Sequence, residues 1–200
     1  MIITSVRKTS SERYTITVDG EEVRSTLGVV TELRLFDGKN IDREQLEEIK
    51  LLSVRYLTRE KALEILSRRL MSSGELKKKL MEKGADADTA DYCVGWLTDN
   101  RLLDDAHYAE AVVRHYSAKG YGIAKIRNEF IKRCISREYW DDALESLPED
   151  TEVIDRLVAQ KLNDPEDRSQ IDKLTSMLYR RGYSWDEIKS ALARFDVDNY

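Results

Sequence analysis

Within the first forty positions, apolar and polar residues alternate in short runs, which is the period of a half-buried β-strand, and residues 27–35 could form a short helix. Residues 14–18 show this alternation most clearly, and Asp19-Gly20 directly after them is a strong signal for a tight hairpin turn. We expect partner strands at 2–6 and 22–26. Because a few short strands have little stability alone, residues 1–41 are predicted to be a small strand-rich extension that packs on the rest of the chain.

From residue 42 onward, apolar residues recur every three or four positions, which is the period of an amphipathic helix. Asp42 and Gln45 suit the first turn of a helix, because side chains at this spacing can bond to each other's free backbone amides. Residues 42–55 are therefore predicted to form a connecting helix.

The remaining chain contains an internal repeat of about 50 residues. Leu80, Phe130 and Leu178 occupy one aligned position, 50 and 48 residues apart. Glycine or cysteine follows four residues after each of them. The other aligned apolar sets are Leu76, Ile126 and Leu174; Val94, Leu144 and Leu192; and Leu97, Leu147 and Phe195.

Residues suited to helix N-caps repeat with the same period. Asp86, Ser136 and Ser184 share one aligned position and can each accept a hydrogen bond from a free amide of the following helix. Apolar positions and caps depend on different physical effects, so their agreement supports a true repeat. Before the middle helices, the expected caps are Ser72 with Glu75, Gly122, and Ser169 with Asp172. Asp104 is expected to cap the helix that carries Tyr108 and Val112.

The predicted fold class is therefore mainly α, with the small N-terminal three-strand extension. Three tandem three-helix repeats are expected at residues 56–105, 106–150 and 151–200. Each such repeat buries its apolar face against its neighbours, which predicts an elongated, curved solenoid.

Charge is unevenly distributed along the repeats. The chain has a formal net charge of −5, yet residues 114–137 carry seven Lys/Arg and one Glu, whereas residues 138–172 carry twelve Asp/Glu and three Lys/Arg. A local excess of positive charge is what phosphate binding requires, although a solvated helix face gives the same pattern. The candidate partner-binding residues are Lys119, Tyr121, Lys125, Arg127, Lys132 and Arg133, with Arg68, Arg69, Lys77 and Lys78 extending the basic edge.

Helical spacing assigns different roles to the charges of residues 123–132. Ile123, Ile126 and Phe130 have the spacing of one apolar face, which is expected to be buried. Lys125 and Lys132 are expected to project from the side opposite Ile126 and Phe130, which leaves their charges free for a partner. Arg127 and Arg133 lie beside the apolar face, where internal ion pairs are expected.

Motifs for catalysis, metal binding or cofactor binding are absent from the sequence. Gly120-Tyr121-Gly122 lacks the third glycine of a nucleotide-binding loop. His107 and His115 are eight residues apart, and no cysteine or carboxylate completes a metal-ligand set with them. We therefore expect no enzyme activity, no metal and no cofactor. No apolar segment reaches membrane-spanning length, which predicts a cytoplasmic protein, and we expect a monomer.

Several segments together resemble the RecX family of bacterial RecA regulators. These segments are Gly74-Glu75-Leu76, Leu103-Asp104-Asp105 with Tyr108-Ala109, the stretch KGYGIAKIRNEFIKRCISRE at 119–138, and LYRRGYSWDEI at 178–188. The resemblance covers the three helical repeats. It implies a non-enzymatic protein that binds within the helical groove of a RecA–DNA filament and slows its extension or promotes its disassembly.

Two positions depart from the family pattern. Ile123 stands where a proline is usual at the first helical turn, and Cys134 stands where a glycine is expected just past the helix. A left-handed backbone at Cys134 would cost on the order of 1 kcal/mol. Direct binding of DNA through the basic edge is the alternative function, and a helical enzyme has little support.

Overall fold

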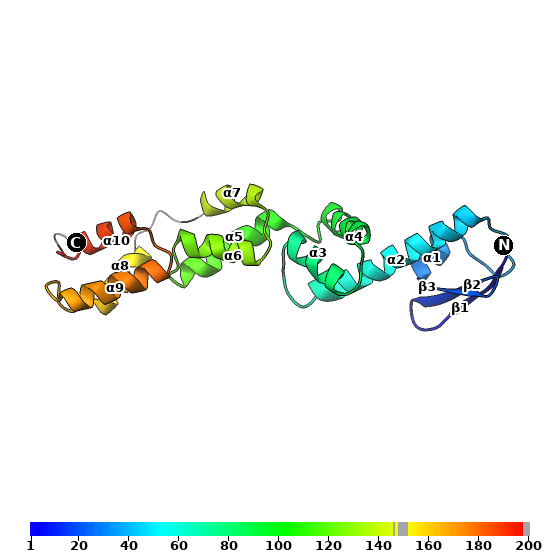
Figure 1. Cartoon of the computed structure of the whole chain (residues 1–200), viewed down its shortest axis with the longest axis horizontal. Helices are drawn as coiled ribbons and strands as arrows, with labels where there is room; N and C mark the ends of the chain where they lie inside the picture. Colours follow the sequence, from blue (N-terminus) through cyan, green and yellow to red (C-terminus); the bar gives the residue numbers. More distant parts are fainter. Residues whose placement is uncertain (146, 148–151, 198–200) are drawn as a thin grey trace. The chain divides into compact units, whose positions relative to one another are not determined.

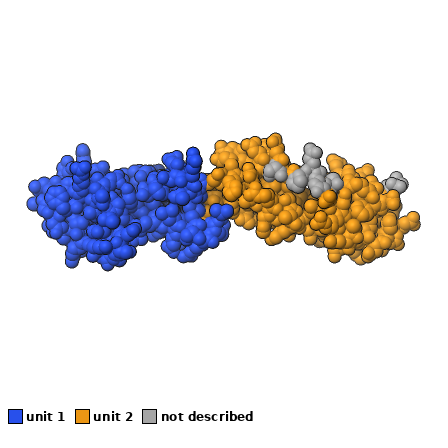
Figure 2. Space-filling view, turned by 180° about the vertical axis from the view of Figure 1, so that it is seen from behind, with its two compact units in different colours: residues 1–70, 76–103 blue, residues 71–75, 104–200 orange. Residues whose placement is uncertain are grey.

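The computed structural model describes residues 1–145, 147 and 152–197 (Figure 1). The chain divides into two compact units, which Figure 2 shows in different colours. The first unit comprises residues 1–70 and 76–103, and the second comprises residues 71–75 and 104–200.

The N-terminal extension is a three-stranded antiparallel sheet in the order β1-β2-β3, as the alternation of residues predicts. Its strands are β1 (Ile3–Lys8), β2 (Arg13–Val18) and β3 (Glu21–Thr26). Ile16 on the central strand lies opposite Val6 and Val23, so that its neighbours fix the register. The short helix α1 (Leu27–Glu32) comes directly after β3.

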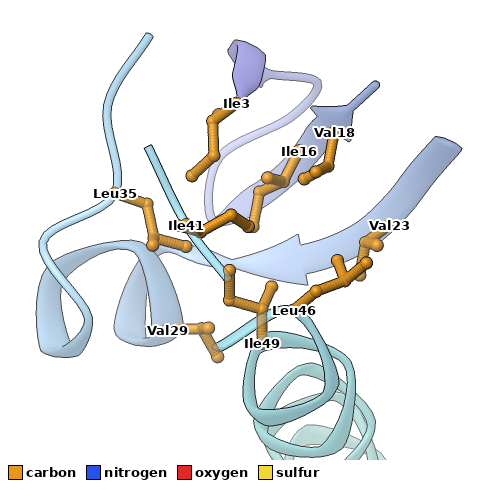
Figure 3. Packing of buried hydrophobic residues seen from close by; sticks show 9 residues of the cluster. All are labelled: Ile3, Ile16, Val18, Val23, Val29, Leu35, Ile41, Leu46 and Ile49. Atoms are coloured by element: carbon orange, nitrogen blue, oxygen red, sulfur yellow. The ribbon is translucent and has the colours of Figure 1, made fainter. Parts of the chain in front are cut away.

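One face of this sheet packs against α1 and the N-terminal part of the long helix α2 (Arg43–Leu66). Figure 3 shows how isoleucine and valine side chains from the strands meet leucine and isoleucine from α2. The extension therefore packs on the helical part of the chain, as expected. The cluster comprises Ile3, Ile16, Val18, Val23, Val29, Leu35, Ile41, Leu46 and Ile49.

Helix α2 begins at the predicted capping pair and continues beyond the predicted connecting helix. The Asp42 carboxylate accepts from the Gln45 amide at 2.8 Å, and the Gln45 side chain accepts from the Asp42 amide at 3.0 Å. The helix runs without interruption through position 55, so one helix serves both the N-terminal sheet and the first repeat. Arg59 on α2 lies between the rings of Tyr56 and Trp96, 4.1 and 3.9 Å from their centres, which ties α2 to α4.

The repeats use corresponding helices. In the first repeat, α3 (Ser73–Glu82) and α4 (Ala87–Asp99) come after α2. The second contains α5 (Asp105–Ala118), α6 (Ile123–Lys132), a 3₁₀ turn (Arg137–Tyr139) and α7 (Trp140–Glu145). The third contains α8 (Glu152–Lys161), α9 (Arg168–Arg180) and α10 (Trp185–Ala193). We call α3, α6 and α9 the middle helices.

Two of the four aligned apolar sets are buried in every repeat, whereas Val94, Leu144, Leu147 and Phe195 of the other two sets are half-buried. Leu80, Phe130 and Leu178 each lie on a middle helix and are almost completely inaccessible to solvent. We expect each change to alanine to lower the free energy of unfolding by about 2–5 kcal/mol, because it removes buried methylene groups and leaves a cavity. Urea unfolding of the three variants would measure this loss, and a variant within about 1 kcal/mol of the parent would contradict the aligned register.

Two of the predicted caps are wrong. Ser136 makes no side-chain cap hydrogen bond and precedes the 3₁₀ turn, whose first amides it does not reach. Ser169 lies inside α9, since Asp167 caps this helix by accepting from the Gln170 amide at 3.1 Å. The aspartate starts α9 earlier than the repeat pattern indicates. The other expected caps are present at Asp42, Ser72, Asp86, Asp104, Gly122 and Ser184.

Each middle helix ends at a residue with a left-handed backbone. Gly84, Cys134 and Gly182 have φ values of 93°, 52° and 92°. Cys134 therefore adopts the conformation expected of the glycine that it replaces, at the cost that a β-carbon carries in this region.

Candidate partner-binding surface

The outward face of α6 presents two isoleucines on either side of an arginine. Ile123, Arg127 and Ile131 are four residues apart, so they share one side of the helix. All three are exposed. The prediction that Ile123 belongs to the buried face is wrong, because the buried face of α6 begins at Ile126. An exposed arginine flanked by apolar side chains is a composition typical of interaction hot spots.

A buried carboxylate, Glu129, lies on the other side of the same helix. It is 8% exposed. It accepts hydrogen bonds from Lys132 Nζ at 3.0 Å and from the Tyr116 hydroxyl at 2.9 Å. Lys125 Nζ lies 3.9 Å and Arg133 Nε 3.8 Å from its oxygens. Glu129 is therefore the shared counter-charge of three basic side chains, whose combined positive charge exceeds its own.

The environment of Glu129 stabilises its ionised form. Burial works against ionisation of the carboxyl, but the hydrogen bonds from Lys132 and Tyr116 and the charges of Lys132 and Arg133 outweigh this effect. The pKa of Glu129 consequently lies below its ordinary value of 4.5.

Arg133 joins this network to α5. Its guanidinium donates to the Tyr108 hydroxyl at 2.8 Å and to the Tyr116 hydroxyl at 3.4 Å. The expected internal ion pair of Arg133 is therefore present. Contrary to expectation, Lys125 and Lys132 are not free but interact with Glu129. A lysine side chain is long enough to bring its ammonium group back to Glu129 from the outer side of the helix. Reversing either lysine would disturb the fold as well as the surface.

The other predicted residues of the second unit differ in the contacts that their side chains make. Within the part of the chain that the structure describes, the side chains of Lys119 and Arg127 make no hydrogen bond or ion pair, and both residues are exposed. The prediction of an internal ion pair for Arg127 is therefore wrong, because its side chain points to solvent. Tyr121 is half-buried, with Arg181 at 5.5 Å and Lys125 at 5.9 Å from its ring centre.

The predicted residues of the first unit are mostly paired. Arg68 bonds to Glu64 and Lys77 to Asp91, each at 2.6 Å, and Arg69 donates to the Leu70 carbonyl at 3.3 Å. Lys78 is exposed, and no described residue pairs with it. The ten predicted residues thus belong to two different units, six in the second and four in the first.

The repeat carries one exposed apolar position that was not predicted. Ile131 aligns with Met81 and Tyr179 at offsets of 50 and 48 residues. These side chains are 58%, 45% and 68% exposed, although the residue before each of them is fully buried. The alignment that identified Leu80, Phe130 and Leu178 contains this signal, because the next residue is also large and apolar in all three repeats. We call Met81, Ile131 and Tyr179 the exposed repeat position.

Two backbone junctions lie within the second unit. The amides of Gly122 and Ala124, at the start of α6, donate to the carbonyls of Arg181 and Gly182 at the end of α9, at 2.9 and 3.2 Å. A β-carbon at Gly122 would overlap the carbonyl of Gly182. At the start of α3, the Ser72 hydroxyl donates to the Arg133 carbonyl. A β-carbon at Gly74 there would overlap the backbone of Cys134, at the end of α6.

Metal binding and membrane insertion have no support among the described residues. No group of three or more histidine, cysteine or acidic residues among them is arranged to hold a metal ion. No helix within the described ranges is long and apolar enough to cross a membrane. Burial raises the pKa of the Cys93 thiol to about 11, which keeps this thiol protonated and unreactive.

Sequence comparisons match the chain to one protein family. Residues 58–97 match the first three-helix domain of RecX and residues 104–144 match the second. The regulatory protein RecX of Vibrio campbellii is 32% identical over 152 residues, covering 74% of this chain and 98% of that protein. The regulatory protein RecX of Xanthomonas axonopodis pv. citri is 35% identical over 143 residues, covering 70% and 88%.

Solved structures show the same fold. A crystal structure of regulatory protein RecX matches with a TM-score of 0.74 and 24% identity, covering 94% of this chain and 97% of that one. The RecX structure from Lactobacillus salivarius matches with a TM-score of 0.62 and 23% identity, covering 72% and 97%. From its relatives and from the two domains that it contains, the chain belongs to the RecX family of regulatory proteins.

Proposed function

We propose that this chain binds the RecA–DNA filament and inhibits the recombinase, ATPase and coprotease activities of RecA. Membership of a family of regulatory proteins supports a regulatory role, and the resemblance of 119–138 to the RecX pattern implies RecA as the target. The proposed mechanism requires no chemical step catalysed by this chain, because a chain that occupies the filament groove hinders extension of the filament. We also propose the residue ranges 56–105, 106–150 and 151–200 as the functional repeats.

The exposed repeat position is the observation that carries the proposal. A large apolar side chain that keeps 45–68% of its surface exposed at one equivalent site in every repeat contributes less to folding than a buried one does. A partner built from identical subunits offers the same apolar pocket many times. A repeated contact residue suits such a partner, because several weak contacts on one chain combine into strong binding.

Substituting the exposed repeat position tests this directly. We expect the double variant Ile131→Gln and Tyr179→Gln to inhibit RecA at least tenfold less well. Each lost apolar contact is expected to lower the binding free energy by about 0.7 kcal/mol, and the two losses together correspond to a tenfold weaker affinity. Its thermal stability should stay within a few degrees of the parent, because both side chains are exposed. RecA ATPase on single-stranded DNA would measure the inhibition.

The matched control is Leu51→Gln with Val54→Gln. These two residues are also exposed apolar positions on a helix, but they lie outside the repeats. If the control weakens inhibition as much as the double variant does, the repeat position has no special role.

Direct DNA binding is the second candidate, and it rests on the exposed side chains of Lys119, Arg127 and Lys78. Phosphate contacts would make binding weaken steeply with salt. A fluorescently labelled single strand titrated with the chain alone at two salt concentrations distinguishes the candidates. Strong, salt-dependent binding without RecA favours this alternative.

A further inference from the structure

The C-terminal ends of α6 and α9 are both covered by the start of another middle helix. The small residues Gly122 and Ala124 meet the end of α9, and the small residues Ser72 and Gly74 meet the end of α6. Ser72 aligns with Gly122, and Gly74 aligns with Ala124, because each of these two pairs is 50 residues apart. A helix that starts with two small residues, two positions apart, therefore fits the end of a middle helix.

The end of α3 is the equivalent site in the first repeat, and it is open. A β-carbon at Gly84 would have no described atom within 4 Å, whereas one at Gly182 would overlap the Lys125 amide. Beside it lies a cavity of about 330 Å³. Its lining consists of Lys61, Glu64, Ile65, Arg68 and Lys83.

This cavity corresponds to the space that a turn fills in the third repeat. Lys61 and Lys83 align with Leu157 and Arg181, at offsets of 96 and 98 residues. A β-carbon at Gly120 would lie 3.1 Å from Leu157 Cδ1 and 3.0 Å from Arg181 Nη1, so the turn before α6 sits between them. Arg181 also donates to the Lys119 and Gly120 carbonyls at 3.0 and 3.2 Å.

We propose that the open end of α3 binds the start of a helix from another protein. The bound segment carries glycine, serine or alanine at two positions that are separated by one residue, because larger side chains would overlap the backbone at Lys83 and Gly84. An acidic residue stands in its first turn. Three basic side chains line the cavity and only Glu64, already paired with Arg68, opposes them.

A second copy of this chain does not provide such a segment from its third repeat. The positions of α9 that align with Gly122 and Ala124 are Gln170 and Asp172, and both side chains are larger than those of glycine, serine or alanine. Helix α9 also starts earlier, at Arg168 with the Asp167 cap. The starts of α3 and α6 are already engaged with the ends of α6 and α9 in the same chain. The occupant is thus a different protein whose helix starts with small residues.

A peptide of residues 70–82, LMSSGELKKKLME, is the probe, because it contains Ser72, Gly74 and the first-turn Glu75. We expect it to shift the amide resonances of Lys83, Gly84 and Ala85 in the isotope-labelled full chain, with a dissociation constant of about 1 mM. The same peptide with Ser72→Gln and Gly74→Asp, the residues found in α9, should leave these resonances unchanged.

Substitutions in the full chain provide a second test of the proposal. Gly84→Ala should abolish the shifts, because its methyl group occupies the docking position. Gly38→Ala is the matched control, since Gly38 has nearly the same φ, 87° against 93°, and equally open surroundings. The proposal is overturned if the parent peptide leaves Lys83–Ala85 unshifted at several times the expected dissociation constant, or if both peptides shift them equally.

Discussion

Replacing Gly122 by valine is expected to lower the free energy of unfolding by about 3–5 kcal/mol. The new side chain would overlap the Gly182 carbonyl, and forced overpacking costs about 1–3 kcal/mol. Separating the two backbones also breaks the hydrogen bonds from Gly122 and Ala124, each of which contributes about 1 kcal/mol. Urea unfolding followed by circular dichroism would measure the loss.

Gly95→Ala is the control for this substitution. Gly95 lies inside α4 with open space around it, so alanine there should raise stability by about 0.5–1 kcal/mol. If Gly122→Val leaves the unfolding free energy within about 1 kcal/mol of the parent, the junction between α6 and α9 does not stabilise the fold.

Removing the buried carboxylate should have a comparable effect. We expect Glu129→Ala to cost about 3 kcal/mol, because Arg133 is left half-buried without its counter-charge. Glu110→Ala is the matched control. Glu110 pairs with Arg114 four residues away on the surface of α5, and such exposed pairs contribute under about 1 kcal/mol. Equal losses for the two variants would contradict a special role for Glu129.

The same carboxylate predicts a pH dependence. The pKa of Glu129 is lower in the folded chain than its ordinary value of 4.5, so its ionised form stabilises the fold. This contribution is complete above about pH 4.5 and is lost as the pH falls through the folded pKa. The stability difference between the parent and Glu129→Gln should therefore be largest near neutral pH and shrink in acid. A difference that stays constant from pH 7 to pH 3 would contradict this assignment.

Local signals explain why much of the fold could be predicted. The hairpin at Asp19-Gly20 and the capping box of Asp42 and Gln45 each depend on a few neighbouring residues. The aligned register of Leu80, Phe130 and Leu178 could be recognised because burial recurs with the repeat.

The candidate surface was harder to predict, because it depends on where long side chains end. Helical spacing gives the direction of the Cα–Cβ bond at Lys132, but its ammonium group returns to Glu129. The same spacing placed Ile123 on the buried face, since the pattern cannot show that the buried face begins at Ile126. The role of Gly122 depends on Gly182, sixty residues later in the sequence, which no local pattern contains.

The most direct measurement is the rate of ATP hydrolysis by RecA on single-stranded DNA while this chain is titrated in. Inhibition of a filament predicts that the rate falls when the chain is present at fewer copies than RecA, because one bound chain affects many subunits. An unchanged rate with the chain in excess over RecA would contradict the proposed function.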